Sequence, residues 1–198
     1  MIDIPLYYDF ASTICYVTHR VMQRKAAELD GLGVSLVWKP IDLARITGWP
    51  RGADVEGPRR ENALRVAAEF SIAALMPARW LDSRALHAVT LDLRGTTREP
   101  TWRERVWTAV YDEGRKVDEP GELERLGADL GIDTARLASE AGLARVDAET
   151  RLAYEAGVGG VPTFDLAGWF LCGLQDDETT RRILERFVAK QRDREAAG

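Results

Sequence analysis

The sequence predicts an α/β fold in which an all-helical insertion interrupts a small sheet, and three observations lead to it. Apolar runs of strand length occur near the two ends of the chain, at residues 4–10, 34–38 and 164–172. Between them, apolar residues recur at helical spacing from residue 59 to residue 157. The chain has 198 residues, 45% of them hydrophobic, which suffices for one domain that carries an insertion.

The first strand leads directly into the start of a helix. The apolar run from Ile4 ends at Phe10, and Ser12 then opens a segment of helical periodicity. Backbone N–H groups at a helix start are unpaired and carry partial positive charge, so a thiolate beside Ser12 would be stabilised. In a simpler interpretation Ser12 only caps the helix, which is worth about 1 kcal/mol. The apolar positions expected on this helix are Tyr16, Val17, Val21, Met22, Ala26 and Leu29.

A second strand follows at residues 34–38, after Gly31 and Gly33 end the helix. Strand, helix and strand in this order predict a βαβ unit. Residues 49–57 are then rich in Gly, Pro and charge, which predicts a mobile loop near the active-site end of the sheet. Five side chains in and after this loop are candidates for a substrate wall: Trp49, Arg51, Asn62, Trp80 and Arg84.

From residue 59 to residue 157 the sequence predicts helices almost throughout, separated by Gly, Pro and Asp punctuation. One expected helix contains Ala63, Phe70 and Ala74 on its apolar face. Two others contain apolar residues at Leu86, Val89 and Leu93, and at Val106, Val110 and Tyr111.

The run Gly157–Phe164 ends the helical region and begins a strand. Residues 164–166 and 169–172 predict a hairpin, and a last helix is expected from about Asp176. Since antiparallel strands return to the same end of a sheet, Cys172 is expected at the end where the first helix begins.

The composition limits which kinds of binding partner and which cell compartment are expected. The net charge is −5 and acidic and basic residues are mixed, so no nucleic-acid partner is expected. No apolar run approaches the ~20 residues that span a bilayer, and no signal core is visible, so we expect a cytoplasmic protein without a membrane partner. Cys15 and Cys172 make no disulfide framework and are expected as buried thiols. His19 and His87 have no ligating partner at helical spacing, so no metal is expected.

The residues around the first helix start resemble a known family. Residues 9–16 read Asp-Phe-x-Ser-x-x-Cys-Tyr, similar to the active-site turn of the DsbA-like thioredoxin superfamily, where redox members read Asp-Phe-x-Cys-Pro-x-Cys-Tyr. The glutathione-using branch, which comprises 2-hydroxychromene-2-carboxylate isomerases and kappa-class glutathione transferases, carries Ser at the first Cys position, as Ser12 does here. The chain departs from both branches at Thr13 and Ile14, and it has Cys15 where the isomerases usually have Ser.

This resemblance implies a thioredoxin fold, a mixed sheet flanked by helices, with an all-helical insertion domain of DsbA type. Residues 1–48 and 158–198 would form the thioredoxin-like domain, and residues 49–157 the helical insertion domain. The resemblance covers nearly the whole chain, with further similar runs at residues 38–48, 81–88 and 110–118.

The resemblance places the second half of the site in the loop before the third strand. Val161-Pro162-Thr163-Phe164 is similar to the family's cis-proline loop, which implies a cis Val161–Pro162 bond although only about 5–6% of X–Pro bonds are cis. Peptide groups beside that proline would pair with glutathione in the manner of an added strand. The turn containing Gln175 and Asp176 would bind the ends of glutathione, whereas Leu174 cannot.

In such a site the Ser12 hydroxyl would donate a hydrogen bond to the sulfur of glutathione and help to hold it as thiolate. Cys15 lies one helical turn further in, and without a thiol at position 12 the exchange cycle of a Cys-x-x-Cys pair cannot run. The expected partners are glutathione, as cosubstrate, and a small conjugated or aromatic substrate. Kappa-type relatives tend to dimerise, which favours a homodimer.

Three functions remain open on the sequence. The first is a glutathione-dependent isomerase or transferase that uses Ser12. The second is a thiol-disulfide oxidoreductase of DsbA type that has lost its first cysteine and uses Cys15 or Cys172. The third is a non-catalytic thioredoxin-fold binding protein that has lost the site, which the residues Thr13, Ile14 and Leu174 favour.

Overall fold

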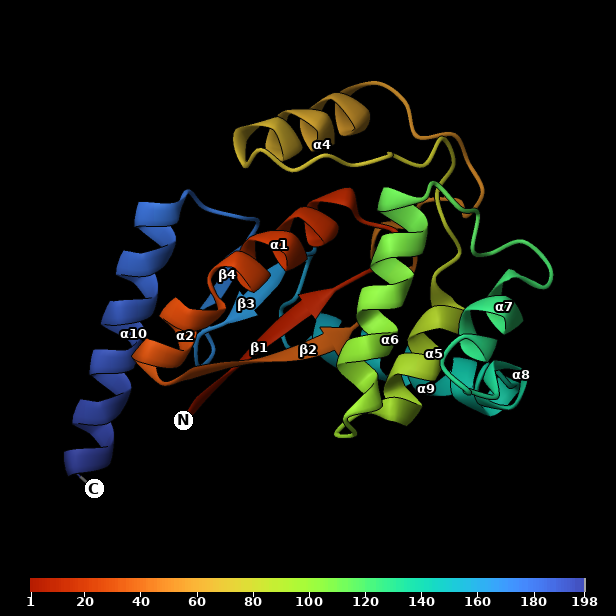
Figure 1. The fold of residues 1–198 in the computed structure, drawn as a ribbon. Coiled ribbons are helices and arrows are strands. Elements are labelled where there is room, and N and C mark those ends of the chain that lie inside the picture. Colours follow the sequence, from red (N-terminus) through yellow and green to blue (C-terminus); the bar gives the residue numbers. More distant parts are fainter. Residues whose placement is uncertain (198) are drawn as a thin grey trace.

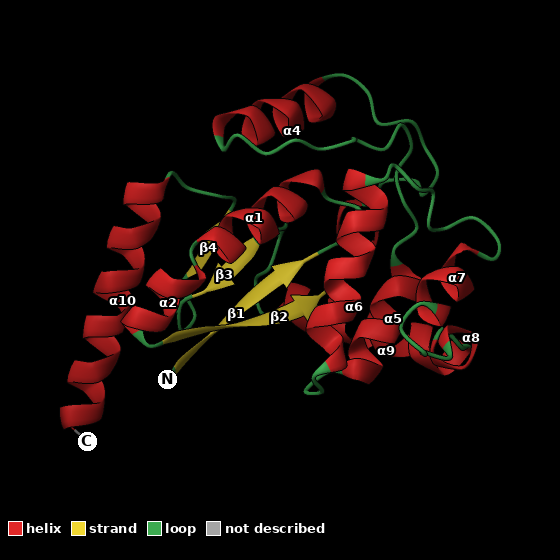
Figure 2. Ribbon diagram, in the orientation of Figure 1, coloured by secondary structure: helices red, strands yellow, loops and turns green. Residues whose placement is uncertain are grey.

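The computed structural model describes residues 1–197, and its centre is a four-stranded mixed sheet (Figures 1 and 2). Its strands are β1 (Ile2–Tyr8), β2 (Val34–Pro40), β3 (Thr163–Asp165) and β4 (Phe170–Cys172), in the order β2-β1-β3-β4. The β1 and β2 strands are parallel, whereas β3 runs antiparallel to both β1 and β4. The βαβ unit and the hairpin that the sequence predicts are therefore present.

Helices cover the two faces of this sheet. The first face carries α1 (Thr13–Arg24), α2 (Ala26–Leu32) and α10 (Asp177–Ala197), whose apolar residues share one core with alternate residues of β1. The other face carries the end of α9 (Glu140–Glu155), where Ile41, Ala153 and Val158 form a smaller cluster. The predicted first helix is thus two helices, because the chain bends at Lys25 between α1 and α2.

Seven further helices lie between β2 and the end of α9. They are α3 (Leu43–Thr47), α4 (Pro58–Glu69), α5 (Arg84–Leu93), α6 (Arg98–Trp107), the π-helical turn η1 (Thr108–Asp112), α7 (Glu122–Ala128) and α8 (Thr134–Leu137). Helix α5 packs against both α6 and α9. Within residues 1–197, no helix is both long enough and apolar enough to cross a membrane.

Residues 49–80 form an arm that lies over α1 (Figure 1). Its two stems pair antiparallel, since the Gly52 N–H donates to the Trp80 carbonyl at 2.7 Å and the Val55 N–H donates to the Ala78 carbonyl at 2.8 Å. Between the stems the chain forms α4 and then returns in an extended path. Figure 1 shows α4 at the outer end of this arm, above α1.

The helix expected to reach Ala74 ends earlier, at Glu69. Ser71 has a φ of 52°, which ends the helical path. The Arg24 guanidinium donates to the carbonyls of Phe70 and Ser71, at 2.9 and 3.3 Å, and so satisfies carbonyls that the helix leaves unpaired. A contact from another helix therefore fixes this helix end.

Aromatic side chains join the helical region to the first strand and helix. The Phe10 ring lies 4.9 Å from the Trp107 ring in an edge-to-face arrangement, and the Tyr16 and Tyr111 rings stack at 4.7 Å. Such pairs add about 0.5–1.5 kcal/mol beyond the burial of their area. The Tyr111 hydroxyl also donates to the Phe10 carbonyl at 2.9 Å. Residues of the helical region therefore help to fix the position of the turn between β1 and α1.

Candidate active site

The turn between β1 and α1 places Ser12 at the start of the helix. Its backbone is extended, and its Oγ accepts a hydrogen bond from the Cys15 N–H at 3.3 Å. The N–H groups of Thr13 and Ile14 have no acceptor among the described residues, and both residues line a cavity. Unpaired amides at a helix start attract anions, so this corner of the cavity suits a thiolate.

Cys15 lies behind this corner and is fully buried. Burial raises the pKa of its thiol to about 12, although the Ser12 hydroxyl acts in the opposite direction. The thiol is therefore protonated near neutral pH, and a protonated thiol is a poor nucleophile. The structure places Cys15 beside Ser12, as the sequence predicts, but not on the cavity wall.

The loop before β3 forms the other side of the corner. The Val161–Pro162 bond is cis, as the resemblance implies, and Val161 lines the same cavity as Ser12. Neither backbone group of Val161 forms a hydrogen bond to another residue in the described part of the chain. The Pro162 carbonyl, in contrast, accepts from the Gly173 N–H at 2.8 Å. The peptide group of Val161 is thus free to pair with an extended ligand.

Cys172 lies at the same end of the sheet, as expected, but it is exposed rather than buried. It pairs with Thr163 across the β3–β4 ladder, directly after the cis-proline. A Cβ built on Gly160 would lie 3.7 Å from the Cys172 sulfur, so the thiol lies against the loop that leads to Val161.

The cavity has a volume of about 150 Å³ and is mostly apolar. Most of its lining comes from the arm, and its charged lining residues are Arg59 and Arg79. The Arg59 guanidinium stacks 3.4 Å from the centre of the Trp49 ring, and Trp49 meets Trp80 edge to face at 4.8 Å. No carboxylate or histidine lines this cavity among residues 1–197. Its walls are therefore aromatic and positively charged.

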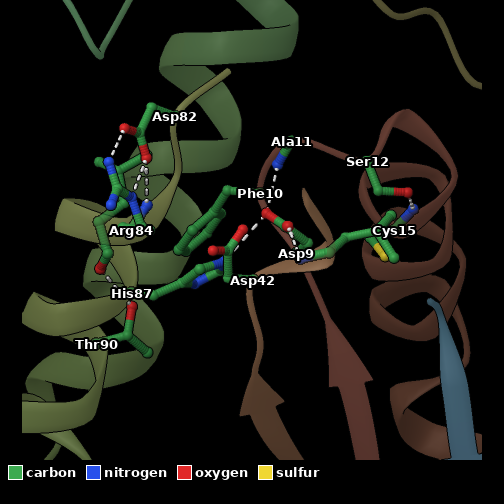
Figure 3. Close-up of polar contacts among 12 residues, drawn as sticks. Asp9, Phe10, Ala11, Ser12, Cys15, Asp42, Asp82, Arg84, His87 and Thr90 are labelled. Carbon is green, nitrogen blue, oxygen red and sulfur yellow. Dashed lines mark hydrogen bonds and ion pairs between the residues drawn. The ribbon is translucent and has the colours of Figure 1, made fainter. Parts of the chain in front are cut away.

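A buried polar network lies directly behind the Ser12 turn (Figure 3). The Asp9 carboxylate accepts hydrogen bonds from the N–H groups of Ala11 and Leu43, at 2.9 and 2.7 Å, and from His87 Nε2 at 3.1 Å. Burial acts to raise the pKa of Asp9, but the interaction with His87 and the further hydrogen bonds to the carboxylate together outweigh it and hold the pKa below its ordinary value. Asp9 is therefore a buried anion that fixes two backbone segments.

Asp42 lies beside this network and is also buried. Burial and the nearby charge of Asp9 raise the pKa of Asp42, although its ion pair with Arg51 acts against them. Arg51 also lies 3.5 Å from Asp82, which binds Arg84 at 2.6 Å. Two predicted wall residues, Arg51 and Arg84, therefore belong to this network and not to the cavity.

Gln175 and Asp176 lie away from the cavity. They line a separate hollow together with Arg24 and Lys25. Asp176 Oδ1 accepts from the Thr179 N–H at 2.9 Å, and this bond lowers the pKa of Asp176. Its carboxylate caps the start of α10. The structure therefore brings Ser12 and Val161 together on one cavity and leaves Gln175 and Asp176 outside its lining.

Sequence reasoning found Trp49, Asn62 and Trp80 in the cavity wall and missed Arg59 and Arg79. Arg59 lies in the first turn of α4 and Arg79 in the returning stem of the arm, and no motif in the sequence marks either of them. His87 was also missed, because its partner Asp9 lies 78 positions earlier in the chain. Among the described residues, no group of three or more potential ligands could hold a metal ion.

Comparisons with known proteins agree with this fold. A family model described as a DSBA-like thioredoxin domain matches residues 3–185. The solved structure of a 2-hydroxychromene-2-carboxylate isomerase is similar with a TM-score of 0.72 and 23% identity, covering 99% of this chain and 98% of that one. A sequence search of curated proteins finds no match.

Two further solved structures share the fold as well. Cytosolic disulfide reductase DsbM from Pseudomonas aeruginosa, solved with GSH, has a TM-score of 0.59 and 22% identity, covering 98% of both chains. DsbA1 from Neisseria meningitidis has a TM-score of 0.57 and 16% identity, covering 99% of this chain and 87% of that one. The thioredoxin fold of DsbA type that the sequence predicts is thereby confirmed.

Proposed function

This chain belongs to the DSBA-like thioredoxin family, and from that premise we propose that it is a glutathione-dependent isomerase or transferase. Its substrate would be a small conjugated or aromatic electrophile. Ser12 would contact the sulfur of glutathione, and the Val161 peptide group would pair with the tripeptide backbone. Glutathione would act as cosubstrate, without a metal.

One observation carries this proposal: Ser12, the free amides of Thr13 and Ile14, and Val161 all lie on one apolar cavity. A thiolate in that corner would meet hydrogen-bond donors that lower its free energy relative to the thiol. Arg59 and Arg79 add positive charge on the opposite wall. The neighbour solved with GSH supports glutathione as the ligand, because it shares the fold.

The proposed chemistry needs no protein nucleophile. The thiol of glutathione loses its proton to water, since no carboxylate or histidine lines the cavity within the described residues. The thiolate then forms a C–S bond to an electrophilic carbon. In conjugate addition the electron pair of the C=C bond moves toward the carbonyl oxygen, and reversal after bond rotation expels the thiolate and gives an isomer. The Ser12 hydroxyl stabilises the thiolate before attack and after release.

Disulfide exchange in the DsbA manner is less consistent with the site. Position 12 has a hydroxyl where the attacking sulfur would lie, and Cys15 is buried and protonated. A resolving thiol without an attacking thiol cannot complete the cycle.

Calorimetry with glutathione tests the proposal directly. We expect wild-type protein to bind glutathione and to lower the pKa of its thiol, measured from the ultraviolet absorbance of the thiolate. S-methylglutathione has no ionisable thiol and serves as the control for tripeptide binding alone. The proposal is wrong if glutathione does not bind, or if its thiol keeps its solution pKa when bound.

The exposed Cys172 favours a second candidate function, that of a monothiol oxidoreductase. Its sulfur lies next to the loop that leads to the cis-proline, where a disulfide partner would dock. Glutathione-dependent reduction of a mixed disulfide on Cys172 is the activity to measure. If Cys172→Ser loses that activity while Ser12→Ala keeps it, the second candidate replaces the first.

The compartment and the assembly are part of the same proposal. A glutathione-dependent enzyme belongs in a reducing compartment, which fits a cytoplasmic location. A homodimer is the expected assembly, and light scattering on the purified chain would show it as a mass twice that of one chain.

A further inference from the structure

His87 is a buried polar residue that the proposed chemistry does not use. It lies on α5, in the helical region, and is fully buried. Its ring stacks on Phe10 with centres 5.0 Å apart and meets Tyr8 edge to face. Its Nδ1 has no hydrogen-bond partner within residues 1–197, so the bond from Nε2 to Asp9 is the polar contact of this ring.

The polarity of that bond follows from its partner. An ionised carboxylate only accepts hydrogen bonds, so His87 Nε2 carries the hydrogen and donates it to Asp9 Oδ1. The same oxygen accepts from the Ala11 N–H, and Oδ2 accepts from the Leu43 N–H. Charge-assisted bonds of this kind are among the stronger ones in proteins. His87 is thus one of three donors that fix the Asp9 carboxylate.

The two backbone groups that Asp9 holds both belong to the cavity wall. Ala11 precedes Ser12, Leu43 begins α3, and both line the cavity. The Ser12 N–H also donates to the Asp9 carbonyl at 3.0 Å. A rotation of the Asp9 side chain would therefore move the segment that carries Ser12 and the opposite segment at Leu43. Figure 3 shows Asp9 between the Ser12 turn and His87.

A second carboxylate makes the donor on His87 more important. Asp42 is buried next to Asp9, and its ion pair with Arg51 from the arm offsets only part of the repulsion between the two carboxylates. Without a donor from α5, the Asp9 carboxylate would keep two backbone partners and face a like charge. A buried anion that loses a partner gains mobility or draws in water.

We propose that His87 is a positioning residue for the Ser12 site, acting through Asp9 to hold the backbone of Ala11 and Leu43 in place. The effect of His87 on catalysis rests on the proposed function. Its effect on the backbone of Ala11 and Leu43 does not depend on that function. The helical region would thereby set the geometry of a thiol site built on the sheet.

Hydrogen exchange of single amides, followed by NMR in the ligand-free protein, tests the structural part. In His87→Phe, which keeps a stacked ring but lacks a donor, we expect the amides of Ala11 and Leu43 to exchange about tenfold faster relative to the Val106 amide. His87→Gln restores a donor near the Nε2 position and should recover most of the protection. If Phe overpacks, His87→Met provides the donor-free variant.

Thr90→Val is the matched control on the same helix. It removes a buried hydroxyl that bonds to Leu86 and Trp102 and does not touch Asp9. We expect it to lower global stability without changing the ratio of Ala11 or Leu43 exchange to Val106 exchange. Equal effects of the two variants on that ratio, or no effect of His87→Phe, would overturn the proposal.

Glutathione and a nitro-substituted chlorobenzene then test the functional part. We expect His87→Phe to lower kcat about tenfold or more while the Kd of glutathione changes little, because misplacement at a site costs turnover before binding. Should wild-type protein not bind glutathione, the proposed function fails, and the exchange ratios still decide the role of His87. Should it bind and His87→Phe keep wild-type kcat, the functional role of His87 is wrong.

Discussion

Cys15 lies one helical turn behind Ser12, and its backbone N–H donates to the Ser12 hydroxyl oxygen while its own thiol is buried. Residues 12 and 15, at the two positions of the Cys-x-x-Cys motif that this turn resembles, therefore differ in their surroundings. Ser12 borders the cavity, and Cys15 belongs to the core. Under the proposed function, this corner would therefore receive the sulfur of glutathione rather than supply one.

Thiol labelling of native protein follows from that arrangement. Burial raises the pKa of Cys15 to about 12, whereas Cys172 is exposed. We expect a thiol reagent at neutral pH to modify Cys172 readily and Cys15 only after unfolding, since thiolate fraction and access set the rate. Mass spectrometry of each cysteine gives the result. Rapid labelling of Cys15 in the folded protein would contradict the structure.

Ser12→Ala separates capping from chemistry. The variant loses an N-cap, which costs about 1 kcal/mol of unfolding free energy, and it loses the hydroxyl donor to the sulfur. We expect the pKa of bound glutathione to rise and kcat to fall about tenfold, since one donor to a charged group is worth about that factor. Asp133→Ala removes the cap of α8, where Asp133 accepts from the Arg136 N–H. Asp133→Ala should lower the unfolding free energy by a similar amount and leave the pKa of bound glutathione unchanged. If kcat is the same in Ser12→Ala and Asp133→Ala, Ser12 serves only as a helix cap.

Trp49→Ala tests the aromatic wall. The ring supports the Arg59 guanidinium and meets Trp80, so its loss removes one face of the cavity. For an aromatic electrophile we expect KM to rise about tenfold, which matches the loss of one ring contact. Trp169→Ala is the control, because Trp169 is 55% exposed on the β3–β4 hairpin. A normal KM in Trp49→Ala would remove the arm from the substrate site.

Asp9→Asn tests the buried anion through pH. The folded-state pKa of Asp9 is lowered, so its stabilisation is present above the unfolded pKa of about 3.9 and is lost as pH falls through the folded value. We expect the variant to be about 1–3 kcal/mol less stable near neutral pH, since an amide cannot accept all three hydrogen bonds. The difference in unfolding free energy between Asp9→Asn and wild type should become smaller as the pH falls below about 4.

Urea unfolding across that pH range gives the measurement. Asp3→Asn, on the exposed start of β1, calibrates the effect of losing one surface charge. A gap for Asp9→Asn that stays constant with pH would show that Asp9 is not an anion in the folded protein.

Hydrophobic periodicity and turn residues correctly predicted the elements of this fold that short segments of sequence determine. The change from strand to helix at Ser12, the βαβ order and the final hairpin all follow from periodicity and turn residues. The cis bond at Pro162 followed from a motif, because no local rule separates it from a trans bond. Helix ends were less predictable, since Arg24 on α1 helps to end α4.

Contacts between residues far apart in the chain could not be predicted from sequence patterns. The Asp9–His87 pair joins the end of the first strand to a helix of the helical region, and no sequence pattern around either residue predicts that they interact. The pairing of the two stems of the arm was equally unpredictable, because the hydrogen bonds of Trp80 with Gly52 and Ala53 follow from the path of the chain and not from its composition. This pairing places Arg79 at the cavity, whereas Arg59 lines it from the first turn of α4.

The arm is one contiguous segment whose two ends leave the body side by side. It supplies most of the cavity lining, whereas Ser12 and Val161 come from the sheet side. Under the proposed function, substrate choice and activation of the glutathione sulfur would therefore be encoded in separate stretches of the gene. If the proposal holds, an exchange of residues 49–80 between homologues would change the substrate in a single recombination event and leave the thiol-activating residues unchanged.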